Sequence, residues 1–146
     1  SDSQGSITAF YTVLSEGDDL QDPIAEASRA ILDGHIVLSR TLADAGHFPA
    51  VDVEKSISRV MPAVTSAEHQ QMARTVKQLY ASYQQSKDLI AIGAYVRGSD
   101  PQLDVAIGMM PRINRFLQQG MHDVVTYDDS LQGLNQLVPA AARSNT

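Results

Sequence analysis

The run DGHIVLSRTLADAGHFPAVDVEKSISRVMP, residues 33–62, decides the fold class of this chain. Within it, residues 35–38 predict a short buried strand, and residues 39–45 predict a helix that Gly46 closes. Upstream, residues 7–14 alternate between two mostly apolar sets, which predicts a strand buried on both faces. Asp22 and Pro23 predict the cap and first turn of an intervening helix. This strand-helix-strand-helix order is typical of a parallel α/β sheet.

After Pro62 the pattern becomes helical. Thr65 or Ser66 predicts the cap of a long helix, which the residues around Gly93 end. Asp100 and Pro101 begin a second helix that Gly120 ends, and Pro111 inside it predicts a kink or a break. Thr126 or Asp128 begins a last helix. Apolar residues recur at helical spacing in all three: Met72, Val76, Leu79, Tyr80 and Tyr83; Leu103, Ala106, Met110, Ile113 and Leu117; Leu131, Leu134 and Leu137.

Composition narrows the function classes. The chain has 146 residues, 43% of them hydrophobic and 19% charged, which is typical of a globular protein. A formal charge of -6 and a pI near 5.0 argue against a nucleic-acid surface. No apolar run approaches the length of a membrane span, and the polar start SDSQGS predicts no signal peptide. With no cysteine, the sequence favours a cytoplasmic protein.

No metal site is predicted. The four histidines are scattered without the close spacing of a zinc site. Asp18, Asp19 and Asp22 lie close together, but they lack the terminal glutamate of a calcium loop. Asp22 is better explained as a helix cap.

Three stretches together point to a known family. The 33–62 run, GSITAFYTVL near the start and EGDDLQDP after it resemble the C-terminal part of a flagellar or type III secretion export ATPase. That family is related to the catalytic β subunit of the rotary ATP synthase, and the resemblance covers Gly5 to about Val138. It implies that residues 1–62 are the end of a RecA-like parallel α/β domain of a P-loop NTPase. Residues 63–146 would be an all-α C-terminal domain.

The resemblance assigns nucleotide-site roles. Arg59, at the end of Ser-Ile-Ser-Arg, corresponds to an arginine finger that acts on the neighbouring subunit's nucleotide, a task that suits an always-charged, planar guanidinium. Phe48 stands where the family has a tyrosine against adenine, and phenylalanine keeps the stacking face. Met121, Val124 and Tyr127 take the remaining adenine-pocket positions. Without the resemblance, Arg59 would be interpreted as a surface charge and Phe48 as a core aromatic.

The resemblance also implies partners. Asp18 and Asp19 would meet a coiled-coil stalk protein inside a homohexamer. The turn around Arg97 lacks most of the acidic residues of the equivalent turn in the synthase, so it is expected to contact a stalk or export-gate partner rather than to act as an acidic lever. A negative regulator and chaperone–substrate complexes are further expected partners. The implied location is the cytoplasmic face of the inner membrane, reached through the export apparatus.

No GxxxxGK[ST] motif occurs in the sequence, so residues that hold phosphate and Mg²⁺ are expected outside this chain. We therefore expect ATP and Mg²⁺ as ligands of a larger ATPase and no hydrolysis by this chain alone. Two alternatives stay open: an ATPase of a virulence injectisome, and a non-catalytic module whose helices bind chaperones or a stalk protein.

Overall fold

The computed structural model describes residues 5, 7–14 and 22–138. These residues form two compact units, Ser1–Asp33 and Gly34–Thr146, which are considered separately. Asp18 and Asp19, the predicted stalk contacts, lie outside the described residues.

The first unit contains helix α1 (Pro23–Ile31), as the sequence predicts. Asp22 caps it, because its Oδ1 accepts hydrogen bonds from the backbone of Ile24 at 2.7 Å and of Ala25 at 3.3 Å. The strand expected over residues 7–14 is not formed: these residues have no regular structure and their apolar side chains are largely exposed. A strand requires a neighbour for its backbone groups, and the described part of this unit provides none.

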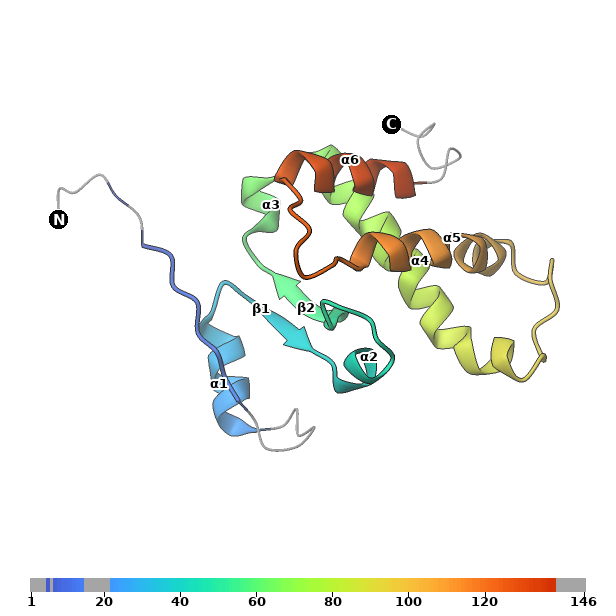
Figure 1. The fold of residues 1–146 in the computed structure, drawn as a ribbon, viewed down its shortest axis with the longest axis horizontal. Helices are drawn as coiled ribbons and strands as arrows, with labels where there is room; N and C mark the ends of the chain where they lie inside the picture. Colours follow the sequence, from blue (N-terminus) through green and yellow to red (C-terminus); the bar gives the residue numbers. More distant parts are fainter. Residues whose placement is uncertain (1–4, 6, 15–21, 139–146) are drawn as a thin grey trace. The chain divides into compact units, whose positions relative to one another are not determined.

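The second unit begins with a two-stranded sheet (Figure 1). Strand β1 (Gly34–Leu38) pairs with β2 (Val51–Ser58), and a short helix, α2 (Arg40–Asp44), lies between them in sequence. The pairing is antiparallel. The parallel pattern that the sequence predicted concerned residues 7–14 and 35–38, and residues 51–58 were not predicted as a strand. The segment between β1 and β2 is shorter than the crossover that a parallel pair needs, so the chain turns back through residues 46–50.

Helices make up the remainder: α3 (Met61–Val64), α4 (Ala67–Ala91), α5 (Pro101–Leu117) and α6 (Tyr127–Leu137). The predicted order of an α/β segment followed by an all-helical one is confirmed. The caps are Ser66 for α4, Asp100 for α5, and Thr126 for α6, where Asp129 completes a capping box. The break predicted at Pro111 does not occur, since α5 continues through this exposed position to Leu117.

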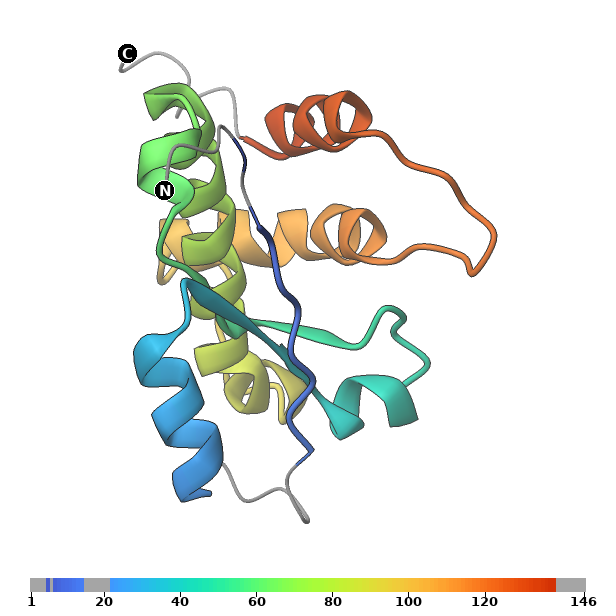
Figure 2. The ribbon, with the colours of Figure 1, turned by 90° about the vertical axis from the view of Figure 1, so that its left-hand side faces the viewer.

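The core lies where the three long helices meet, and α5 and α6 both pack against α4 (Figure 2). Its buried members are Val76, Tyr80, Met110, Ile113 and Leu137, all on stripes that the sequence predicted. Gly133 permits the close approach of α6 to α5, because a Cβ there would lie 2.9 Å from the Phe116 ring. This packing positions the C-terminal end of α5 and the N-terminal end of α6, which the 118–126 loop connects.

In the part of the chain that the structure describes, no helix is long and apolar enough to cross a membrane.

Candidate functional site

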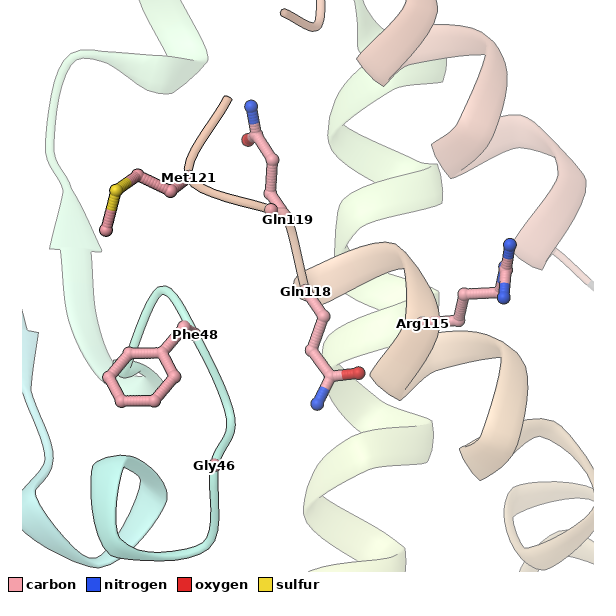
Figure 3. A pocket seen from close by; sticks show the side chains of 7 residues that line it. Gly46, Phe48, Arg115, Gln118, Gln119 and Met121 are labelled. Atoms are coloured by element: carbon pink, nitrogen blue, oxygen red, sulfur yellow. The ribbon is translucent and has the colours of Figure 1, made fainter. Parts of the chain in front are cut away.

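An open hollow of about 590 Å³ lies between the 46–49 turn and the end of α5 (Figure 3). The turn exists because Ser39 caps α2 and the chain then reverses at Gly46, whose φ of 72° favours glycine. The lining residues are Gly46, Phe48, Arg115, Gln118, Gln119, Gly120 and Met121.

Two of the predicted adenine-pocket residues meet in this hollow. Phe48 is 55% exposed and Met121 is 93% exposed, and both side chains project to the same side of the hollow (Figure 3). Arg115 turns away from them. Two exposed apolar side chains at the rim of an open hollow can receive a flat apolar ring system, because the burial of both faces would then be favourable.

Backbone and side-chain hydrogen bonds hold the two walls together. The backbone N–H of Gln119 donates to the Phe48 carbonyl at 2.9 Å. Below them, Gln118 Nε2 lies 3.4 Å from Nδ1 of His47, a buried histidine. The spacing between the 46–49 turn and the end of α5 is therefore set by contacts between residues about 70 positions apart in sequence.

The wall that carries Met121 is itself a hydrogen-bonded turn. Asp123 Oδ2 accepts from the backbone N–H of Gly120 at 2.7 Å, and the Asp123 carbonyl accepts from Gln119 Nε2 at 2.8 Å. A Cβ on Gly120 would lie 2.9 Å from that carboxylate oxygen, so glycine is what allows the carboxylate to pack over the backbone. These hydrogen bonds hold the backbone of the turn that carries Met121.

The other two predicted pocket residues lie elsewhere. Val124 is exposed and does not line the hollow. Tyr127 begins α6, and its hydroxyl lies 3.2 Å from Nδ1 of His69, at the start of α4. The two rings stand 6.2 Å apart at 58°. In this structure Tyr127 therefore links α6 to α4.

Asp129, in the same region, carries a shifted pKa. Its carboxylate accepts hydrogen bonds from the Thr126 hydroxyl at 2.6 Å and from the Thr126 backbone at 3.0 Å. These bonds favour the ionised form and lower the pKa of Asp129 below its ordinary value. The ionised carboxylate in the first turn also suits the positive end of the α6 dipole.

Arg59 stands at the opposite end of β2 from Phe48. It is exposed and lies in the bend that directly follows Ser58, the last residue of the strand. No group of three or more histidine, aspartate or glutamate residues able to hold a metal ion occurs among the described residues.

Comparison with known proteins assigns the family. The model of the ATP synthase alpha/beta family nucleotide-binding domain matches residues 1–58, and the model of the T3SS EscN ATPase C-terminal domain matches residues 65–136. The flagellum-specific ATP synthase of Salmonella typhimurium is 58% identical over 92% of this chain. The chain belongs to the type III secretion ATPase family. It spans about 30% of the length of that relative.

Solved structures of the type III secretion ATPase family share the fold. The assembled ATPase EscN from enteropathogenic E. coli matches 91% of this chain and 32% of its own, with a TM-score of 0.87 and 47% identity. EscN in complex with its central stalk EscO matches 79% of this chain and 28% of its own, with a TM-score of 0.74 and 43% identity.

Sequence reasoning missed most of the lining of this hollow in the type III secretion ATPase chain. Gln118, Gln119 and Gly120 form one wall of the hollow, although the sequence pattern assigned them no role in a site. The available signal was the glycine directly after a predicted helix end, which marks a turn that brings backbone close to other groups.

Proposed function

We propose that this chain supplies part of the adenine site and the arginine finger of a larger ATPase that energises type III protein export. The observation that carries the proposal is the hollow between Phe48 and Met121, whose two walls are joined by the Gln119–Phe48 hydrogen bond. Phe48 and Met121 would contact the adenine. Val124 and Tyr127 would contribute to binding only if the 118–126 loop moved toward the base.

We propose that Arg59 acts between subunits, as the family resemblance implies. Phe48 precedes β2 and Arg59 follows it, and Arg59 does not line the hollow that contains Phe48. Phe48 would serve the subunit's own nucleotide and Arg59 the neighbour's, in a homohexameric ring.

ATP and Mg²⁺ are the ligands we propose for the whole enzyme. The residues that hold the phosphates and the metal would lie outside this chain, since its 146 residues contain no phosphate-loop motif. In this chain, Phe48 and Met121 would orient the base and Arg59 would stabilise charge on the transferred phosphoryl group. This chain alone would not hydrolyse ATP.

The same proposal covers organisation and partners. We place the functional boundary between residues 62 and 63, which lies in the gap between the two family matches. A coiled-coil stalk protein would contact Asp18 and Asp19 inside the ring. A negative regulator, the export gate and chaperone–substrate complexes would bind as well. The enzyme would work at the cytoplasmic face of the inner membrane.

The flagellar branch is favoured over the injectisome branch. Identity is 58% to the flagellum-specific ATP synthase of Salmonella typhimurium and 50% to the SPI-2 type 3 secretion system ATPase of the same organism, each over 92% of this chain. The test is complementation of a strain that lacks its flagellar export ATPase by the intact subunit carrying this sequence. Restored motility supports the flagellar assignment, while restored effector secretion in an injectisome mutant without motility would support the alternative.

The catalytic part of the proposal is tested by Arg59→Ala in the intact subunit. Loss of an arginine finger is expected to lower turnover by about 10³- to 10⁵-fold. Arg74→Ala, which removes an exposed arginine from α4, is the control and should retain wild-type turnover. Wild-type turnover in Arg59→Ala would refute the finger role and favour a non-catalytic binding module.

A further inference from the structure

The antiparallel ladder of β1 and β2 is interrupted by a large bulge that ends three residues before Arg59. Pairing is regular from Leu38↔Val51 to Val37↔Asp52 and resumes at His35↔Ile57. Between these pairs β1 contributes only residue 36, whereas β2 contributes residues 53–56. Bulges concentrate next to functional sites, where they re-aim the chain that follows.

Side chains within the bulge replace the missing ladder bonds. Oδ1 of Asp52 accepts from the backbone N–H groups of Glu54 and Lys55, both at 3.1 Å. Its Oδ2 lies 3.2 Å from Lys55 Nζ. The Ser56 hydroxyl donates to the Asp52 carbonyl at 2.6 Å and accepts from the Val37 N–H at 3.0 Å. The bulge is therefore held by its own hydrogen bonds and by one to Val37 of β1.

This unit is docked on helix α4. Val53 packs against the helical core, and Lys77 Nζ on α4 donates to the Ser56 carbonyl at 3.4 Å. Burial raises the pKa of the α4 residue Tyr80, and the carboxylates of Glu54 and Asp52 raise it further, which agrees with a bulge close to α4. The start of the finger segment is thus attached to the helical domain by the packing of Val53 and by the Lys77 hydrogen bond.

A short, tightly paired stretch connects Ser56 to Arg59. Ile57 and Ser58 are in register with His35 and Gly34. A Cβ on Gly34 would lie 2.5 Å from the Ile57 carbonyl oxygen, so the two strands approach here as closely as glycine allows. Because this stretch has little freedom, a displacement at Ser56 is carried to the position of Arg59.

We propose that Lys77 and Asp52 are positioning residues for Arg59, which hold the finger segment against α4 through the bulge. The inference rests on the proposed function of Arg59. Neither side chain needs to touch nucleotide. Their loss would leave Phe48 and its hollow intact and would misplace the guanidinium, so turnover would fall without a matching loss of nucleotide binding.

The test uses the intact, assembled ATPase with Lys77→Met, which keeps the stem of an exposed side chain and removes its donor. Misplacement of a catalytic group by about 1 Å can lower the reaction rate about 100-fold. We therefore expect kcat to fall by about 10- to 100-fold, while the KM for ATP changes less than about two-fold. Lys77→Arg keeps a donor and should recover most of kcat. Lys87→Met, on an exposed position of the same helix, should match wild type.

Asp52→Asn gives a second, independent variant, since it weakens the carboxylate bonds of the bulge without changing its size. It should also lower kcat at constant KM.

Arg59→Ala, measured alongside these variants, separates the proposed positioning role from the proposed function of Arg59. If Arg59→Ala keeps wild-type turnover, the proposed function itself fails. If Arg59→Ala is inactive while Lys77→Met and Asp52→Asn keep wild-type kcat, only the positioning role is overturned. The positioning role would also be overturned if the variants with lower kcat unfolded at a lower temperature or failed to assemble, and if Lys77→Arg did not recover kcat.

Discussion

Replacing Gly120 by alanine tests how the second wall of the hollow is held. The new Cβ would lie 2.9 Å from Oδ2 of Asp123 and 3.2 Å from its Cγ and Oδ1. A short carboxylate can rotate away from this contact, so steric strain is relieved. The cost is the 2.7 Å hydrogen bond from the Gly120 N–H, which the rotated carboxylate can no longer accept.

The magnitude follows from that one bond. A hydrogen bond to a charged acceptor contributes about 1.5–3 kcal/mol, and exposure of this turn to solvent reduces the figure to about 1 kcal/mol. Alanine also lowers the entropy of the unfolded chain, which stabilises the fold by about 0.4–1 kcal/mol. The two effects nearly cancel in the free energy of unfolding. The entropy gain does not restore the lost hydrogen bond that holds the wall carrying Met121. A loss of about 1 kcal/mol in that wall corresponds to about five-fold weaker nucleotide binding.

Titration of the intact protein with a fluorescent ATP analogue, combined with urea denaturation, measures both quantities. Gly108→Ala is the matched control, because Gly108 is exposed within α5 and a Cβ there meets nothing within 4 Å. It should stabilise the helix by about 1 kcal/mol and leave affinity unchanged. Wild-type nucleotide affinity in Gly120→Ala would refute the idea that the Asp123 turn sets this wall.

Two further outcomes are expected. Met121→Ala should weaken nucleotide binding, whereas Val124→Ala should not, because Met121 lines the hollow and Val124 does not. Equal losses of nucleotide affinity in the two variants, measured in the same titration, would show that the 118–126 loop closes over the base. The lowered pKa of Asp129 stabilises the folded state above its unfolded value near 3.8, and this contribution is lost as pH falls through the folded value. Asp129→Asn should abolish that part of the pH dependence of thermal unfolding between about pH 5 and pH 3, and an unchanged acid profile would contradict it.

The long helices could be predicted from sequence because their signals are local. Ser66, Asp100 and Thr126 each stand directly before an apolar stripe of helical period, and each caps its helix in the structure. Capping depends on residues two or three positions apart, so the chain needs no distant information to place these ends. Of the kink or break predicted at Pro111, the break did not form, because packing of α5 against α4 outweighs the cost of one lost helical bond.

The strands could not be predicted in the same way. Residues 7–14 have the stronger apolar pattern and form no strand, whereas Val51–Ser58 is largely polar and forms β2. A strand is stabilised by its neighbour, and β1 happens to lie beside the second segment. The sequence gives no direct sign of which segment will have that neighbour.

For the candidate site, the sequence by itself determined the residue types: an aromatic before a proline, an arginine after a strand, and helices that end at defined caps. Tertiary structure decided which of them meet. It brought Met121 to Phe48 and left Val124 outside the hollow. It paired Tyr127 with His69 and tied the segment before Arg59 to Lys77. The physical reason is that each of these contacts joins residues that are distant in sequence, so it depends on how the helices pack and not on any local pattern.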